Sequence, residues 1–287
     1  MKMSESIKNR YEFKFLFDVE NGNPNGDPDA GNMPRVDAET GYGIVTDVCL
    51  KRKIRNYVEL VKNDAEKYKI YIKEGSVLNQ THAIAYDRTG IPKDKKPTRA
   101  DVQILKQFMC DNYYDVRTFG AVMSSDVNCG IVRGPVQLNF ARSVDSVLPQ
   151  EITITRMAIT NERDIEKKIN EMGRKFVLPY ALYVAEGYVS AALAEKTGFN
   201  EEDLNLLWDA IINMFENDHS AARGKMALRK LFIFKHDTPL GVAPSHKLFD
   251  IIKVERKDIN KPSRCFEDYE VTVDKTAIPN GVQLIER

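Results

Sequence analysis

The alternation of side chains near the start of the chain constrains its fold more than any other feature. Over residues 11–19 the odd positions carry large apolar side chains: Tyr11, Phe13, Phe15, Phe17 and Val19. The even positions are Glu12, Lys14, Leu16 and Asp18. A period of two residues predicts a strand with one buried face. Such a strand needs neighbouring strands and a second layer that covers its apolar face.

Two amphipathic helices can supply that layer. Thr46 is a typical N-cap residue with Asp47 in the first turn, which predicts a helix reaching about Lys62. Its apolar stripe consists of Leu50, Ile54, Tyr57, Val58 and Val61. Asn200 precedes an acidic first turn and begins the second helix. The apolar stripe of this helix consists of Leu204, Leu207, Trp208, Ile211 and Phe215.

Further strands are predicted at about 116–124, 131–142, 176–184 and 228–234, with short strands near 249–254 and 269–273. Without insertions the order is strand, helix, strand, strand, helix, strand. This order predicts one α+β domain over residues 1–287, with a ferredoxin-like, RNA-recognition-like βαββαβ core. Residues 64–115 are expected as a helical insertion. Residues 146–174 are expected as a hairpin that leaves the core and carries a helix-like piece from Asn161 to Met172.

The charge balance limits how such a chain could bind nucleic acid. Lys plus Arg and Asp plus Glu both total 42, so the formal net charge is zero. A binding surface for phosphates must therefore be a local basic face. The cysteines and histidines have no zinc-ligand spacing, and we expect free thiols, no metal and no cofactor. The polar start of the chain shows no secretory signal and no apolar run is long enough to cross a membrane, so a cytoplasmic protein is expected.

The loop from Asn21 to Arg35 is rich in Asn, Asp, Gly and Pro. It superficially matches a calcium-binding loop, but its first three donors would be neutral amides and its twelfth position is Asn32 instead of a bidentate Glu. A series of Asx turns that builds a shaped surface is the better interpretation.

The helix that follows this loop carries Lys51, Arg52 and Arg55, at i, i+1 and i+4. At 3.6 residues per turn these cations share one flank beside the apolar stripe. Along the helix, Asp47 and Glu59 are the acids near enough to neutralise them. A solvated face with snorkelling stems is the alternative. Because the loop that ends in Arg35 directly precedes the helix, we predict that the cations bind successive phosphates.

Weaker candidates lie on other elements. In the strand 131–142, Gln137 and Asn139 are expected on an open sheet face opposite the buried Val136, Leu138 and Phe140. In the predicted hairpin, Arg156 and Met157 could wedge into a neighbour or between bases. Arg223 adds positive charge to the turn before the last core strand. Ordinary solvent exposure explains each of these equally well.

Several segments together resemble the Cas7 backbone family of CRISPR effector complexes, in particular its type I-C branch (the Csd-two proteins). The resemblance rests on Phe17–Pro28, Asp47–Arg55, Asp115–Met123 and Arg133–Ser143. It implies a palm, a finger at 64–115 and a thumb at 146–174. It also implies that several copies coat one CRISPR RNA, with each thumb folded over the guide, and that the exposed guide segments pair with target DNA.

The resemblance also suggests roles for residues. Lys51, Arg52 and Arg55 match the basic helix that contacts the guide backbone. Weaker matches are Arg35, Met123, Arg142 and Arg223. The hypothesis is a non-catalytic, oligomeric guide-RNA coat that assembles with other type I-C effector subunits and contacts no membrane.

Two alternatives remain open from the sequence. One is a CRISPR-associated endoribonuclease of the same superfamily, for which His82, His219, Asp27 or Asp37 could act. Established nucleophile and P-loop motifs are missing from the sequence. The other alternative is an adaptor that contacts protein alone.

Overall fold

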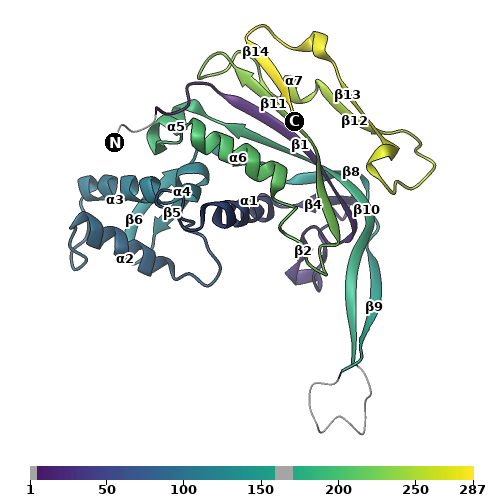
Figure 1. Ribbon diagram of the computed structural model, residues 1–287, viewed down its shortest axis with the longest axis horizontal. Coiled ribbons are helices and arrows are strands. Elements are labelled where there is room, and N and C mark those ends of the chain that lie inside the picture. Colours follow the sequence, from purple (N-terminus) through teal and green to yellow (C-terminus); the bar gives the residue numbers. More distant parts are fainter. Residues whose placement is uncertain (1–4, 159–170) are drawn as a thin grey trace.

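The computed structural model describes residues 5–158 and 171–287 and shows a mixed α+β fold built on one antiparallel sheet (Figure 1). The strand order is β14-β11-β1-β10-β8-β4, and β7 and β9 also pair with β10. The strands are β1 (Tyr11–Gly22), β4 (Tyr42–Val45), β7 (Val136–Leu138), β8 (Ala141–Ser146), β9 (Gln150–Arg156), β10 (Glu171–Val189), β11 (Lys225–His236) and β14 (Val282–Glu286). The strand β14 was not predicted from the sequence.

Two helices cover one face of this sheet. They are α1 (Asp47–Lys62) and α6 (Glu201–Asn213), and both N-caps are as predicted. The Thr46 side chain accepts from the Cys49 backbone N–H, and Asn200 forms a capping box with Asp203. Phe13, Phe15 and Phe17 point into the core between the sheet and these helices. The period of two in β1 therefore reflects this core, as expected.

The opposite face of β1 is also covered, contrary to the prediction of one exposed face. Glu12, Lys14 and Asp18 are buried together with Leu16. The chain after β11 supplies this cover: α7 (Ser245–Phe249), β12 (Ile252–Arg256) and β13 (Tyr269–Val273) pack their apolar residues against Leu16, Phe232 and Phe234. The predicted strand near 249–254 therefore starts later, because residues 245–249 are helical.

Residues 64–133 form a lobe beside the sheet with an apolar core of its own. The lobe contains α2 (Leu78–Thr89), α3 (Arg99–Asn112), α4 (Tyr114–Phe119), β5 (Gly120–Ser124) and β6 (Asn128–Arg133). The helical insertion predicted at 64–115 is thus continued by a two-stranded hairpin. The prediction of a strand at 116–124 was wrong for residues 116–119, because these residues are helical. The strand predicted at 131–142 is broken into β6, β7 and β8.

The hairpin predicted at 146–174 consists of β9 and the first part of β10, and it projects away from the sheet (Figure 1). Its strands pair from Gln150↔Val177 to Arg156↔Glu171. Every residue of β9 is exposed. Most of the predicted helix-like piece, 161–170, lies outside the described residues, whereas Glu171 and Met172 belong to β10. Among the helices of the described chain, none has the length and apolarity to cross a membrane.

Candidate nucleic-acid interface

The turn-rich loop after β1 is fixed against the start of α1. The Asn25 side-chain oxygen accepts from both the backbone N–H and the hydroxyl of Thr46, at 3.0 Å each. The Asn23 backbone N–H donates to the carbonyl of Ala222 at 2.8 Å. The loop, the amino-terminal turn of α1 and the turn before β11 are therefore held together at one end of the sheet.

A glycine makes this close approach possible. A Cβ atom at Gly22 would lie 1.9 Å from the backbone oxygen of Arg223, so any larger residue would push the turn away. The same region contains two buried polar atoms with no hydrogen-bond partner in the described part of the chain, Asn23 Oδ1 and Arg35 Nε. Unpaired buried polar atoms are costly and rare in folded proteins, and they often mark a place where a ligand or water binds.

Cations from separate parts of the sequence meet at this end of the sheet. Burial raises the pKa of the Cys49 thiol, and Lys53, Arg223 and Arg35 lie near enough to oppose that rise. The structure therefore brings Arg35 and Arg223 to the first half of α1. Each has an acidic neighbour: Arg35 lies 3.3 Å from Asp27, and Arg223 lies 2.8 Å from Asp218. The charge there is partly compensated.

Arg52 is the α1 cation best placed for a ligand. It lines a cleft of about 600 Å³ together with Asn56, Glu59, Lys73, Glu74 and Arg223. One of its guanidinium nitrogens donates to the Ile72 carbonyl at 2.7 Å, which holds the side chain across the start of the lobe. Lys51 pairs with Asp47 at 2.8 Å, as its spacing along the helix predicted, and is largely covered.

Lys51, Arg52 and Arg55 were predicted to share one flank of α1 and to bind successive phosphates, but the structure buries Arg55. Its guanidinium Nε donates to Asp115 Oδ2 at 2.8 Å, and the exposed fractions of the two side chains are 11% and 1%. Asp115 also accepts from the backbone N–H groups of Tyr71 and Ile72, at 2.7 and 3.1 Å. Arg55 therefore ties α1 to the lobe, and its charge is used inside the protein.

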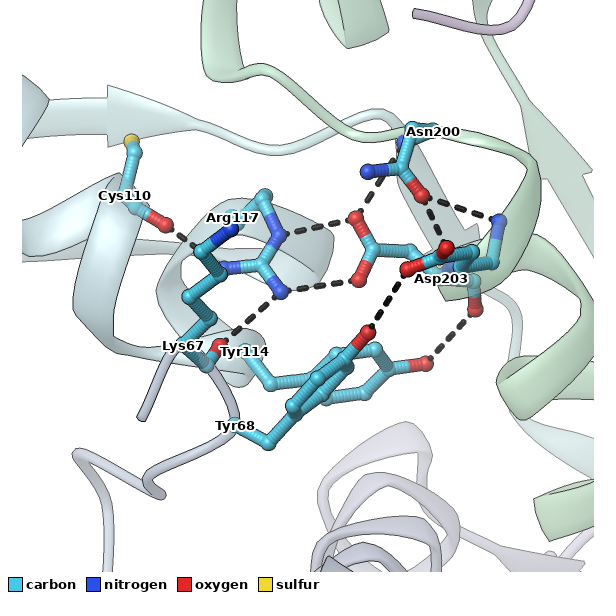
Figure 2. A network of polar contacts seen from close by, with 8 residues as sticks. Lys67, Tyr68, Cys110, Tyr114, Arg117, Asn200 and Asp203 are labelled. Carbon is cyan, nitrogen blue, oxygen red and sulfur yellow. Dashed lines mark hydrogen bonds and ion pairs between the residues drawn. The ribbon is translucent and has the colours of Figure 1, made fainter. Parts of the chain in front are cut away.

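A second buried ion pair ties the lobe to α6 (Figure 2). Arg117 donates through Nε and a terminal nitrogen to the two carboxylate oxygens of Asp203, both at 2.8 Å. Its remaining donors reach the carbonyls of Cys110 and Lys67, at 2.7 and 3.0 Å. Figure 2 shows Tyr68 and Tyr114 packed beside this pair. The roles of Arg117, Asp115 and Asp203 could not be predicted from the sequence, since no local pattern connects residues so far apart.

Three further candidates, Met123, Gln137 and Asn139, differ in burial and in their contacts. Met123 is fully buried in the core of the lobe, so its side chain does not face solvent, and its nearness to a guide stays a prediction. The Gln137 amide donates to the Gly134 carbonyl at 3.1 Å. Asn139 is exposed and donates to the Tyr188 hydroxyl at 3.1 Å. Phe140, expected in the core, is 55% exposed because β7 ends at Leu138.

The remaining candidates lie on or beside the projecting hairpin. Arg142 on β8 is 62% exposed and lies 3.3 Å from Asp37. Arg156 pairs with Glu171 across the hairpin, and Met157 is 77% exposed. The Lys175 ammonium donates to the Ala221 carbonyl, so the base of the hairpin contacts the same turn that carries Arg223. The hairpin and Arg223, which were separate candidates in the sequence, are therefore connected through this turn.

Comparison with known proteins decides the family. A family model described as CRISPR-associated protein Cas7 matches residues 9–274, nearly the whole chain. The chain belongs to the Cas7 family. A relative from Haloferax volcanii, described as CRISPR-associated protein Cas7, is 28% identical over 229 residues, which cover 71% of this chain and 65% of that protein. The chain thus spans about 65% of the length of this curated relative.

The fold of this Cas7-family chain has a solved counterpart. A chain of a structure described as a CRISPR RNA-guided surveillance complex, pre-nicking, matches with a TM-score of 0.51. The sequence identity is 17%, and the match covers 78% of each chain. At this identity the likeness shows that the two chains share a fold.

Three of the four nuclease candidates of this Cas7-family chain are buried or engaged in contacts within the protein, and the fourth, His219, is exposed. His82 is 1% exposed, lies 2.7 Å from the Tyr71 hydroxyl through Nε2, and has its pKa lowered by burial. Asp27 pairs with Arg35. Backbone hydrogen bonds from Thr40 and Glu39 lower the pKa of Asp37, which caps its own turn. His219 is exposed in the turn before β11.

No group of three or more His, Cys, Asp or Glu side chains suited to a metal ion occurs within 5–158 and 171–287. The loop 21–35 contains a turn of the kind that the Asx-turn interpretation predicts. The Asp27 side chain accepts from the Asp29 backbone N–H at 3.2 Å, and Pro28–Ala30 form a single 3-10 turn. Gly31 takes the left-handed conformation that ends this turn.

Proposed function

We propose that this chain is a non-catalytic guide-RNA-binding backbone subunit of a CRISPR surveillance complex. The family match over residues 9–274 is the observation that carries the proposal. Several copies would coat one CRISPR RNA, leave guide segments free to pair with target DNA, and contact other effector subunits. Base pairing would provide the specificity, so the protein needs contacts to phosphate and sugar instead of base-reading groups.

The geometry supports this role in two ways. The loop 21–35, the start of α1 and the turn at 218–224 bring Arg35, Arg52 and Arg223 to one end of the sheet. A hairpin with exposed apolar side chains projects from the same end, and Ile152, Ile154 and Met172 are 43%, 43% and 77% exposed. A two-stranded arm without a core is suited to contacts outside its own chain.

The finer assignments belong to the same proposal. The chain order β1, α1, β7–β8, β10, α6, β11, with both helices on one face, supports a ferredoxin-like palm. The lobe 64–133 would be the finger, and β9 with the start of β10 the thumb. The segments Phe17–Pro28 and Asp47–Arg55 support the type I-C subtype. Zero net charge suits identical subunits packed side by side, which would repel one another if each were strongly cationic.

Purification from cells that express a CRISPR RNA tests the proposal directly. We expect the protein to co-purify with RNA, measured as a raised ratio of absorbance at about 260 nm over 280 nm, which marks nucleic acid. Guide-length RNA should bind purified protein in a salt-dependent manner. Protein that stays free of RNA at low salt would contradict the proposal and favour the adaptor alternative.

Substitutions at the accessible cations refine the test. We expect the triple variant Arg52→Gln, Arg142→Gln, Arg223→Gln to bind guide-length RNA more weakly. The slope of log affinity against log salt should fall by about 2, since each lost phosphate contact removes roughly 0.7 for a single strand. A matched triple, Lys247→Gln, Lys253→Gln, Lys261→Gln, removes the same charge from exposed sites in the segment after β11 and should leave the slope unchanged. Equal losses in both triples would contradict a specific interface.

The endoribonuclease alternative has a separate test. Incubating the purified protein with precursor RNA, with and without magnesium, should leave the RNA intact. Specific cleavage that is lost in His219→Ala would overturn the non-catalytic assignment. His82→Ala is a poor probe for this purpose, because His82 packs inside the lobe against Tyr71.

A further inference from the structure

A cleft on the far side of the molecule from the projecting hairpin is lined by cations without acidic partners. It lies between α3, β6 and α5 (Ala191–Thr197) and has a volume of about 510 Å³. Its lining residues are Gln103, Lys106, Gln107, Cys110, Ile131, Val132, Arg133, Leu193, Lys196 and Thr197. Helix α5 follows the end of β10, whereas the hairpin is the start of that 19-residue strand, so the two sites lie at opposite ends of it.

The charge of this cleft is unbalanced. Lys106, Arg133 and Lys196 come from three different elements, and none has an ion pair or a side-chain hydrogen bond to any described residue of the chain. The lining contains no Asp or Glu. The amide of the lining residue Gln107 donates to the Asp111 carboxylate at 2.8 Å, and Asp111 is not among the lining residues. Converging cations repel one another, so an arrangement of this kind favours an anion between them.

A buried hydroxyl gives independent support. Thr197 is 2% exposed and lines the cleft, and its Oγ1 has no hydrogen-bond partner within 5–158 and 171–287. A buried hydroxyl that is left unpaired destabilises the folded state, because it has lost its hydrogen bonds to water. Thr197 therefore places an unpaired donor just behind the wall of the cleft, and a ligand that shifts this wall slightly would accept its hydrogen bond.

A second cleft of the same chain has a balanced charge and serves as a comparison. It has a volume of about 330 Å³ and contains Lys247 and Lys253, but Asp250 and Asp274 line it as well. Its lysines therefore have opposite charges beside them. The imbalance beside α5 is therefore not shared by this second lysine-lined cleft.

We propose that the cleft between α3, β6 and α5 binds a phosphate group. A phosphate oxygen accepts from ammonium, guanidinium, amide and hydroxyl donors, and the lining supplies all four. The apolar wall of Ile131, Val132 and Leu193 leaves room for the group that carries the phosphate, such as a sugar or base. The site is separate from the Arg52 and Arg223 interface and does not depend on the guide-RNA role.

Binding of inorganic phosphate and adenosine 5′-monophosphate to the full chain, at constant ionic strength, tests the site. We expect saturable binding by calorimetry, weakened at least about tenfold in Lys106→Gln/Lys196→Gln, because each substitution removes a charge-assisted hydrogen bond to the phosphate. Lys247→Gln/Lys253→Gln removes the same charge from the balanced cleft and should bind as the wild type does. Thr197→Val keeps the side-chain shape, should fold normally, and should weaken binding several-fold.

Competition identifies the source of the phosphate. A single-stranded oligonucleotide that displaces adenosine 5′-monophosphate from the wild type would assign the site to a nucleic-acid strand. An oligonucleotide that does not displace it would assign the site to a small phosphorylated molecule. Absence of saturable binding up to about 10 mM (corresponding to less than about 3 kcal/mol), or equal weakening in both lysine pairs, would overturn the proposal. These outcomes are independent of whether guide RNA binds at Arg52.

Discussion

The lobe at 64–133 and the hairpin of β9 and β10 both extend from the same sheet, but they are held in different ways. The lobe has a buried core and is tied to the sheet layer by the buried pairs Arg55–Asp115 and Arg117–Asp203. The hairpin is stabilised along its length by backbone pairing and by exposed pairs such as Arg174–Glu151. Its side chains have solvent on both faces.

This difference indicates how the two parts contribute to function. Buried, multiply bonded charges fix the lobe at one position relative to α1 and α6, because separating them would leave a desolvated charge without a partner. Exposed pairs contribute little to stability and leave the conformation of the hairpin sensitive to what it contacts. The lobe therefore presents a preformed surface, and the hairpin is the part whose geometry a neighbour or a nucleic acid can adjust.

The strongest test of this comparison removes a buried charge. We expect Arg117→Met to lower the free energy of unfolding by about 3–5 kcal/mol, because Asp203 then stays buried without its partner. The exposed counterpart Arg174→Met should cost less than about 1 kcal/mol. Urea unfolding followed by circular dichroism measures both. Similar losses in the two variants would show that the lobe and the hairpin do not differ in this way.

Arg55 separates structural from binding effects. We expect Arg55→Met to destabilise the protein by about 3 kcal/mol, since Asp115 would stay buried without its cation. At a temperature where both proteins are folded, this variant should bind guide-length RNA with an unchanged salt slope. The Arg52, Arg142, Arg223 triple should show the opposite result, with a lower salt slope and little change in unfolding. An altered salt slope in Arg55→Met would show that Arg55 contacts RNA after all.

The lobe should respond to acid through His82. Burial lowers the pKa of His82 below its ordinary value of 6.5. As the pH falls through the unfolded value, the unfolded chain takes up a proton that the folded lobe does not, so stability decreases. We expect the midpoint of thermal unfolding to fall between pH 7.5 and 5.5 by more in the wild type than in His82→Phe. Identical pH dependence in the two proteins would contradict this role of His82.

Removing the hairpin should have the smallest effect on the stability of the rest of the molecule. The ends of the paired region, Gln150 and Val177, lie opposite each other, so a two-residue turn can replace residues 151–176. We expect the unfolding midpoint in urea to stay close to that of the wild type, because β9 buries no side chain. Under the proposed function, assembly of several copies on guide-length RNA should fail, as measured by mass photometry. Loss of folding instead would show that the hairpin supports the sheet.

The local signals in the sequence predicted the elements well. The alternation in residues 11–19 gave the central strand, and Thr46 and Asn200 marked the helix starts, because strand period and helix caps depend on residues within one turn of one another. The strand predicted at 116–124 failed in its first half, where the lobe core buries Tyr114, Val116 and Phe119 along a short helix. Tertiary packing overrode the local preference there.

The candidate site was predictable in its composition but not in its geometry. Arg35, Arg52 and Arg223 were all candidates from the sequence, and the structure brings them together near α1. The role of Arg55 could not be predicted, because its partner Asp115 lies 60 residues further along the chain. The same holds for Met123, which belongs to a core assembled from both halves of the lobe.

The sequence by itself determined the family, the central strand with its two covering helices, and which segments carry cations. The tertiary structure decided which of those cations face solvent, because burial and charge pairing are set by distances between segments that are remote in sequence. It also decided that the second face of β1 is covered and that Lys106, Arg133 and Lys196 meet at one cleft. A charge on a helix can bind a partner outside the protein when the fold supplies no partner inside it.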